Sequence, residues 1–174
     1  MPREDRAREE LALLGRMPTL PGFREAGTVL LYASAFPEEF ATGPMLRRAV
    51  ELGKRLVCPR VVRKESRLAL VAVDDPGRDF APGSLGIPEP TGDRPEVDPR
   101  SIDWVLVPGL GFDLRCYRIG RGAGYYDRLL PALRPDVPRW SLCLSTQWVT
   151  DLPVEPHDER LDGVADADRV VSRS

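Results

Sequence analysis

Cysteine, histidine and lysine are scarce in this 174-residue chain, and it has no long apolar run. The three cysteines, Cys58, Cys116 and Cys143, lie far apart and form no CxxC pair, so neither a zinc site nor a disulfide framework is expected. Cys58 and Cys143 lie inside apolar runs, where a small buried side chain is the expected role. No apolar run approaches the roughly 20 residues of a membrane span, and the charged N-terminus lacks the apolar stretch of a signal peptide. We therefore expect a cytoplasmic protein without a membrane partner.

The chain also lacks an excess of charge of either sign. It has 25 Lys and Arg against 27 Asp and Glu, a formal net charge of -2, and only Lys54 and Lys64 are lysines. This balance gives no global attraction to nucleic acid, and no nucleic-acid partner is expected, although local arginine clusters can still bind phosphate. The length fits one domain with a sizeable core, so we expect residues 1–174 to form a single, monomeric domain.

Short apolar runs alternate with helical patterns along the chain. Apolar spacing predicts helices over residues 4–17, 45–52 and 125–133, the first ended by Pro18. Buried strands are predicted over residues 28–34, 55–59, 67–73, 103–108 and 139–145. Residues 74–101, rich in proline, glycine and aspartate, predict a long surface connection, and residues 109–124 a loop. This alternation predicts an α/β fold with a mostly parallel sheet covered on both faces, in which ligands bind beyond the carboxyl ends of the strands.

The most informative segment is RIGRGAGYYDR, residues 118–128. Its glycines, Gly120, Gly122 and Gly124, permit positive φ and leave no Cβ in the way, so successive backbone N–H groups can face an anion. The spacing matches neither the GxxxxGK[ST] nor the GxGxxG nucleotide motif. The loop either binds an anionic ligand or merely lets the following helix pack closely. An RGG-like RNA site is disfavoured because the repeat is short and the chain is acidic.

Side chains around these glycines add charge and aromatic surface. Arg118 and Arg121 can supply planar, bidentate donors to phosphate or carboxylate oxygens. Tyr125 and Tyr126 can stack on a heterocycle or hydrogen-bond to it. Asp127 is an oxygen ligand suited to magnesium. Together they favour a flat, anionic ligand.

Other polar residues follow the predicted strands. Glu38 and Glu39 come after the first strand, where a glutamate can accept hydrogen bonds from a pterin-like ring or remain a solvated loop charge. Arg60, just past the second strand, is either a phosphate contact or a surface cation. Asp158 either caps a turn or joins Asp127 in holding one hydrated magnesium ion, if the fold brings the two together.

With these segments in view, the chain resembles the 5-formyltetrahydrofolate cyclo-ligase family, also called methenyltetrahydrofolate synthetases. The resemblance runs in order along most of the chain: TVLLY followed by Glu39, CPR, LGIPEP at residues 85–90, VLVPGLGFDLRCYRIGRGAGYYDRLL at 105–130 and VEPHDERLDGV at 154–164. Family members usually have a basic helix that reaches the nucleotide phosphates, then a second helix, before the first strand. Here only the helix at 4–17 fits, and Arg3, Arg6 and Arg8 are the candidates to replace the basic segment.

The resemblance implies a Rossmann-like three-layer α/β/α sandwich and an ATP-dependent ring closure. The formyl oxygen on N5 of the reduced folate is phosphorylated, N10 attacks the activated carbon, and phosphate leaves, which gives 5,10-methenyltetrahydrofolate and ADP. A chain without a convincing nucleophilic triad fits this chemistry, since phosphoryl transfer needs positioning and charge neutralisation. A non-catalytic folate- or nucleotide-binding relative, and an enzyme on this fold with another small anionic substrate, are the alternatives.

The resemblance also implies roles for individual residues. Arg121 and Tyr125 would be catalytic, and Asp127 and Asp158 would hold Mg²⁺. The folate would contact Glu39, Arg121, Gly122, Ala123, Gly124 and Tyr125. ATP would contact Arg60, Arg118, Ile119, Gly120, Arg121, Gly122, Ala123, Gly124, Tyr125 and Tyr126.

Overall fold

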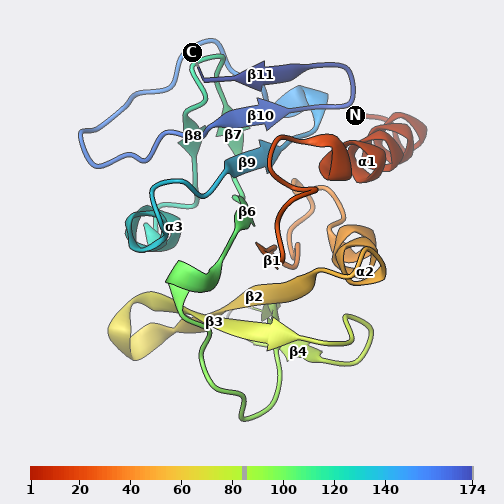
Figure 1. Ribbon diagram of the computed structural model, residues 1–174. Helices are drawn as coiled ribbons and strands as arrows, with labels where there is room; N and C mark the ends of the chain where they lie inside the picture. Colours follow the sequence, from red (N-terminus) through yellow and green to blue (C-terminus); the bar gives the residue numbers. More distant parts are fainter. Residues whose placement is uncertain (84–85, 174) are drawn as a thin grey trace.

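A computed structural model describes residues 1–83 and 86–173 of the chain, so Leu85 of the LGIPEP block lies outside the described residues. Within these ranges a seven-stranded sheet has the order β11-β10-β9-β6-β1-β2-β3 (Figure 1). Its strands are β1 (Thr28–Leu30), β2 (Arg55–Val62), β3 (Arg67–Val73), β6 (Trp104–Leu106), β9 (Arg139–Leu142), β10 (Gly163–Ala165) and β11 (Val170–Ser172). The pairs β1–β2, β1–β6, β6–β9 and β9–β10 are parallel, whereas β2–β3 and β10–β11 are antiparallel. The prediction of a mostly parallel sheet is therefore confirmed.

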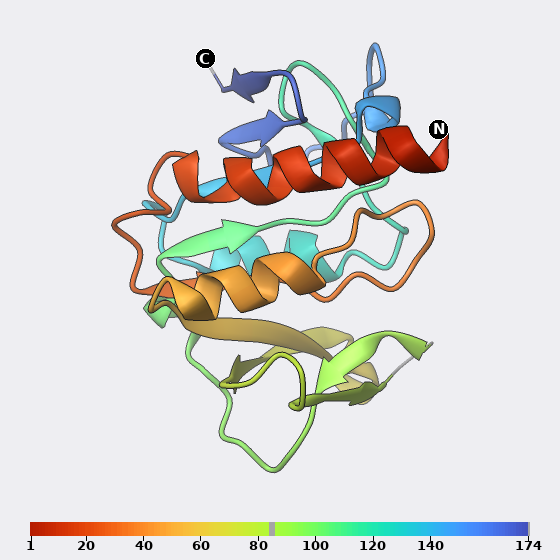
Figure 2. The ribbon, with the colours of Figure 1, turned by 90° about the vertical axis from the view of Figure 1, so that its right-hand side faces the viewer.

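Helices cover both faces of this sheet, which confirms the three-layer arrangement. The helices are α1 (Arg3–Arg16), α2 (Gly43–Glu51) and α3 (Tyr125–Leu129). Figures 1 and 2 show α1 and α2 side by side on one face, with α3 on the other. Short 3-10 turns follow several elements, at Met17–Thr19, Arg63–Glu65, Pro99–Ser101, Leu130–Ala132 and Ser145–Gln147. No helix among the described residues is long and apolar enough to cross a membrane.

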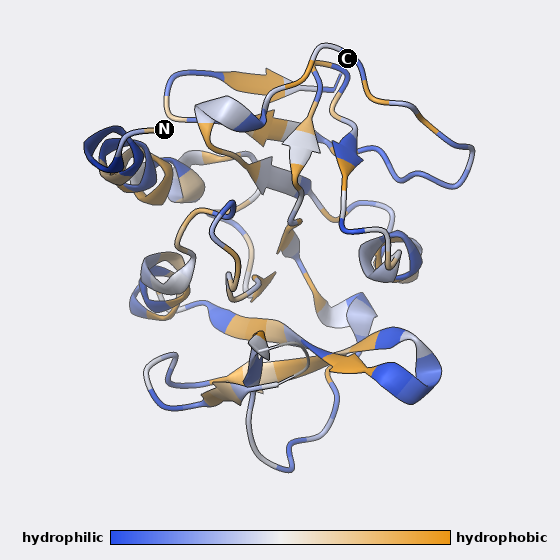
Figure 3. Ribbon diagram, turned by 180° about the vertical axis from the view of Figure 1, so that it is seen from behind, coloured by the Kyte–Doolittle hydropathy of each residue, from blue (hydrophilic) through white to orange (hydrophobic). Residues whose placement is uncertain are grey.

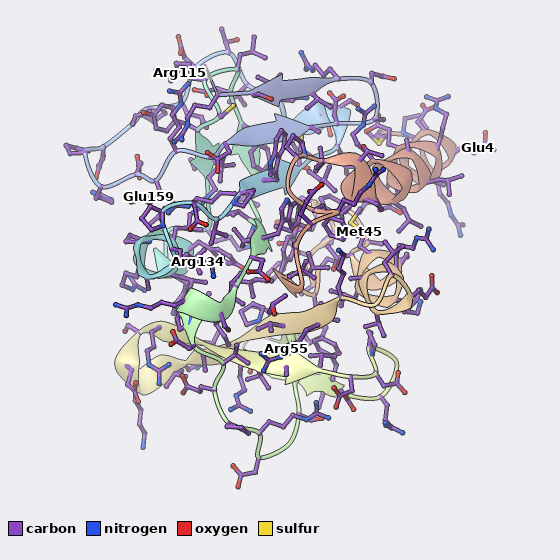
Figure 4. All side chains as sticks on the ribbon, viewed as in Figure 1. Glu4, Met45, Arg55, Arg115, Arg134 and Glu159 are labelled. Carbon is purple, nitrogen blue, oxygen red and sulfur yellow. The ribbon has the colours of Figure 1, made fainter. Side chains whose placement is uncertain are left out.

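The strand alternation divides the core into two layers. Val29 and Leu31 pack with α1 and α2, whereas Leu30 between them packs on the face that α3 covers. The apolar colour in Figure 3 accordingly follows the central strands. Met45 of α2 lies in the interior between α2 and α1, and Glu4 at the start of α1 extends into solvent (Figure 4). As expected, Cys58 and Cys143 are buried and free.

Several predicted elements end earlier in the structure than the sequence indicates. The strands predicted over residues 28–34, 103–108 and 139–145 end at Leu30, Leu106 and Leu142. After β1 the Leu31 N–H still bonds to the Val57 carbonyl at 3.0 Å, whereas the Ser34 N–H bonds to the Thr42 hydroxyl at 2.8 Å and not to a neighbouring strand. The helix predicted over residues 125–133 ends at Leu129, and a 3-10 turn containing Pro131 follows, because proline cannot donate the hydrogen bond that would continue an α-helix.

Both predicted connections contain short hairpins. In residues 74–101, β4 (Phe80–Pro82) pairs antiparallel with β5 (Pro88–Pro90). In residues 109–124, β7 (Gly111–Phe112) pairs antiparallel with β8 (Arg118–Ile119). Neither hairpin was predicted, because two or three paired residues are too few to produce a visible alternation in the sequence.

Candidate functional site

The order of the strands reverses at β1. From β1 the chain adds β2 and β3 on one side, whereas β6, β9, β10 and β11 lie on the other. Parallel sheets of this kind bind ligands where the strand order reverses, beyond the carboxyl ends of the strands. The segment after β1 (residues 31–42) and the segment after β6 (residues 107–124) both leave the sheet at this edge (Figure 2).

The glycine-rich loop begins at the end of β8 and ends at α3. Gly122 and Gly124 have φ of 83° and 65°, so the predicted positive φ is present at these two glycines, whereas Gly120 does not need it. A Cβ on Gly122 would meet no heavy atom within 4 Å, and one on Gly124 would lie 2.9 Å from Nη1 of Arg128. The conformation at Gly122 is thus demanded by the path of the loop and not by packing.

Arg118 and Asp127 close the base of this loop. Nη2 of Arg118 donates to Oδ1 of Asp127 at 2.7 Å, and the Arg118 side chain is only 6% exposed. Its Nε atom is buried and has no hydrogen-bond partner among the described residues. The pair therefore presents a fixed guanidinium with an unused donor beneath the loop.

Tyr126, at the start of α3, carries a second polar atom without a partner among the described residues. This atom is its hydroxyl oxygen, which is buried. Burial raises the pKa of Tyr126 well above its ordinary value, and the Glu39 carboxylate adds to this shift. Tyr32, at the end of β1, has its pKa raised by burial and then by Glu39 and Tyr126. Both phenols thus stay neutral, and both lie close enough to Glu39 for its charge to affect their pKa.

The loop after β1 is ordered around Glu39. Oε2 of Glu39 accepts hydrogen bonds from the N–H groups of Ala35 at 2.9 Å and Phe36 at 3.3 Å, and its own N–H donates to the Phe36 carbonyl at 3.0 Å. Glu39 is therefore neither freely solvated nor mobile in this loop. One carboxylate oxygen, Oε2, thus bonds to the backbone of the loop, and the other has no hydrogen bond to the described residues.

Glu38 and Phe36 join the glycine loop to the loop after β1. Arg121 donates to Oε1 of Glu38, and its guanidinium lies 3.5 Å from the centre of the Phe36 ring. The backbone N–H of Glu38 and then the Arg121 guanidinium hold the pKa of the Glu38 carboxyl below its ordinary value. The sequence assigned no role to Phe36, and it offered Glu38 and Glu39 alike as acceptors for a pterin-like ring or as solvated loop charges. The adjacent glutamates were the available signal, but no pattern indicates which of them reaches Arg121.

The other predicted residues make contacts within the chain that do not by themselves indicate a ligand. Tyr125 stacks near Arg128, with 5.3 Å between the guanidinium carbon and the ring centre. Arg60 donates to the carbonyl of Gly92 at 3.3 Å. Ile119 is exposed in β8, and the carbonyl of Ala123 accepts from Arg128 at 2.8 Å.

Neither Asp127 nor Asp158 belongs to a protein-enclosed metal site in the described part of the chain. Among the described residues no group of three or more His, Cys, Asp or Glu side chains could hold a metal. Oδ2 of Asp158 accepts from the Glu155 N–H at 2.7 Å and so caps a turn, which was the plainer of its two predicted roles. Magnesium bound to a nucleotide takes most of its ligands from phosphate and water and needs only one or two protein carboxylates.

Comparisons with known proteins agree with the resemblance in the sequence. The model of the 5-formyltetrahydrofolate cyclo-ligase family matches residues 1–166. The 5-formyltetrahydrofolate cyclo-ligase of Escherichia coli is 31% identical over 157 residues, which cover 89% of this chain and 86% of the relative. That of Mus musculus is 26% identical over 171 residues, or 92% of this chain and 83% of the relative. The NMR structure of Aquifex aeolicus 5,10-methenyltetrahydrofolate synthetase is similar with a TM-score of 0.84 and 29% identity, covering 99% of this chain and 84% of that chain.

Proposed function

Since the chain belongs to the 5-formyltetrahydrofolate cyclo-ligase family, we propose that it closes 5-formyltetrahydrofolate to 5,10-methenyltetrahydrofolate with ATP as co-substrate. In this reaction the formyl oxygen takes the γ-phosphoryl group of ATP, N10 attacks the formyl carbon and loses its proton, and the oxygen leaves with the phosphate. The products are the methenyl folate, ADP and inorganic phosphate. No covalent enzyme intermediate is required, and the chain's task is to orient two substrates and to balance charge.

The observation that carries the proposal is the pair of unused polar atoms beneath the glycine loop. Nε of Arg118 and the hydroxyl of Tyr126 are buried without partners in the described part of the chain. Each unpaired buried group costs about 1–3 kcal/mol. A bound ligand that supplies acceptors would recover this free energy, which a loop serving only to pack a helix would not explain.

The site residues divide between the two substrates in this proposal. The backbone of residues 118–124 and the arginines Arg118 and Arg60 contact the ATP phosphates, and Tyr126 lines the nucleotide side. Glu39 faces the ring N–H groups of the folate with the carboxylate oxygen that does not bond to the Ala35 N–H. The loop from Arg121 to Tyr125 lies between both substrates, so Arg121 would neutralise charge on the transferred phosphoryl group and Tyr125 would orient the formyl group.

Magnesium would be held by Asp127 and Asp158 together with the phosphates. When bound, the ion neutralises phosphate charge and helps to align the γ-phosphoryl group. Arg118 holds Asp127 in place at 2.7 Å, so the arginine also positions a metal-binding carboxylate.

A turnover assay on the purified protein tests the proposed function. The protein receives 5-formyltetrahydrofolate, ATP and Mg²⁺, and the near-ultraviolet absorbance of the methenyl product is followed. We expect product only when ATP and Mg²⁺ are both present, and we expect folate and ATP each to raise the melting temperature. A folded protein that binds one ligand without turnover would support a non-catalytic relative, and one that responds to neither would point to another anionic substrate.

We further propose that the protein acts as a cytoplasmic monomer. Its three free, buried cysteines suit a reducing compartment. Light scattering on the purified protein measures its mass in solution.

A further inference from the structure

Arg6 of α1 reaches the loop that carries Glu39. Its Nη1 donates to the carbonyl of Pro37 at 2.5 Å, and its Nη2 donates to the carbonyl of Glu39. Its Nε donates to Oε1 of Glu10 at 3.0 Å. Every nitrogen of this guanidinium therefore bonds within the chain, and two of the three bonds hold main-chain oxygens of a single loop.

Glu10 holds the same loop from its far side. The Oε1 atom that accepts from Arg6 also accepts from the backbone N–H of Ala41 at 3.1 Å. Arg6 and Glu10 thus hydrogen-bond to the loop both before and after Phe40, whose side chain is buried in the core. An ion pair between partly exposed groups contributes little stability by itself, so its main effect here is on the path of the loop.

The helix that carries this pair is itself tied to the sheet edge. Glu9, buried on α1, accepts from the backbone N–H of Ser145 at 2.8 Å and from its hydroxyl at 2.6 Å. Ser145 follows β9 on the side of β6 away from β1. The first turns of α1 therefore bond both to the loop after β1 and to Ser145 after β9. These bonds hold the helix, and with it Arg6, in place at the carboxyl edge of the sheet.

We propose that Arg6 is a positioning residue for the folate-binding carboxylate of Glu39, an inference that rests on the proposed function. Arg6 fixes the main-chain carbonyl of Glu39, while the Ala35 N–H fixes one oxygen of its side chain. With both ends held, the second carboxylate oxygen keeps one direction. This role differs from the phosphate contact that the sequence offered for Arg6, because its donors are directed at loop carbonyls.

The first test compares Arg6→Gln and Arg6→Lys with Arg48→Gln. Arg48 lies exposed on α2, paired with Glu51 at 3.3 Å and outside the site, so its variant controls for loss of a surface arginine. We expect Arg6→Gln to raise the KM for folate about tenfold, the size of one lost charge-assisted hydrogen bond that orders a binding loop. The KM for ATP should stay within about twofold. Arg6→Lys should recover only part of the loss, because a single ammonium cannot span the carbonyls of Pro37 and Glu39 as a planar guanidinium does.

A rise in the KM for ATP, with the KM for folate unchanged, would overturn the proposal and assign Arg6 to the phosphates. A double-mutant cycle separates the two roles further. In a Glu39→Gln background, Arg6→Gln should cost little more in folate kcat/KM, because the residue through which it acts has already been altered. Fully additive losses would also overturn the proposal.

A second measurement distinguishes failure of this inference from failure of the proposed function. If the wild-type protein does not cyclise the folate, the proposed function fails, but the hold of Arg6 on the loop can still be measured. Amide hydrogen exchange of residues 35–41 should speed up in Arg6→Gln and in Glu10→Gln, and not in Arg48→Gln. Unchanged exchange in both would refute the positioning role.

Discussion

Nη2 of Arg118 lies 2.7 Å from Oδ1 of Asp127, and this ion pair joins the two ends of the glycine loop. One partner precedes the three glycines and the other follows them. Between Arg118 and Asp127 the loop is largely backbone, and Gly122 and Gly124 adopt positive φ there. The same two residues are the proposed contacts of phosphate and magnesium, so the ion pair that shapes the loop would also contact the ligands.

Replacing Asp127 should therefore affect both stability and turnover. Asp127→Ala leaves the buried guanidinium of Arg118 without its carboxylate, which should lower the free energy of unfolding by about 1–3 kcal/mol in a urea titration. Asp127→Asn keeps an acceptor and should cost less, but it removes the charge that holds magnesium. We expect both variants to lose turnover, whereas full activity in Asp127→Asn would exclude this aspartate as a metal ligand.

Gly122→Val should reduce turnover without unfolding the protein. The backbone at Gly122 has φ of 83°, where a β-branched residue is strained by roughly 1–2 kcal/mol, and the space around it is open. Gly53→Val is the matched control, because Gly53 has φ of 73°, is equally open and lies at the end of α2. Equal melting temperatures with turnover lost only in Gly122→Val are expected. Equal turnover in the two variants would show that the loop conformation is not needed.

Tyr126→Phe should separate binding from stability. The hydroxyl of Tyr126 is buried without a partner in the described residues, so its removal should leave the unliganded protein equally stable, or more stable by up to about 1 kcal/mol. The KM for ATP should nevertheless rise, because Tyr126 lines the nucleotide side of the proposed site and the ligand loses a donor. A variant that is clearly less stable and has unchanged kinetics would assign the hydroxyl a structural role instead.

Stability should fall in acid partly through Asp113. Burial opposes the charge of this carboxylate, but hydrogen bonds from the Arg115 side chain and from the backbone N–H groups of Tyr117 and Leu152 outweigh it and hold its pKa below the ordinary value. A lowered pKa stabilises the fold above the unfolded value, roughly 3.9, and that contribution is lost as pH falls through the folded pKa. The difference in unfolding free energy between wild type and Asp113→Asn should be largest near pH 7 and shrink toward pH 3. A difference that does not change with pH would contradict this account.

Two glycine-to-alanine changes should move stability in opposite directions. A Cβ on Gly163 of β10 would lie 2.2 Å from the ring of Trp140, which is buried on the neighbouring strand, so Gly163→Ala should cost about 1–3 kcal/mol. Gly15 of α1 has nothing within 4 Å of such a Cβ, and Gly15→Ala should stabilise by about 0.4–1 kcal/mol. Thermal unfolding of both variants tests the pair, and a stable Gly163→Ala would mean that the Trp140 ring can shift.

Long apolar segments were predictable because local patterns decide them. The strand predicted over residues 67–73 is β3 with the same bounds, and the predicted parallel sheet and helical layers are present. Elements whose partners are distant in sequence were less predictable. The strand β2 extends to Val62 and not to residue 59, because its second half pairs antiparallel with β3, and β10 was not predicted at all.

The family resemblance, the layered α/β fold and the segments that supply the site could all be read from the sequence, because they follow from residue order, apolar periodicity and the freedom of glycine. Which charges meet depends on the three-dimensional fold. Arg121 pairs with Glu38 across 83 positions, and Arg6 bonds to the carbonyl of Glu39 across 33. A local pattern contains no information about such contacts, since they form only where the strand order reverses and brings separate loops to one edge of the sheet.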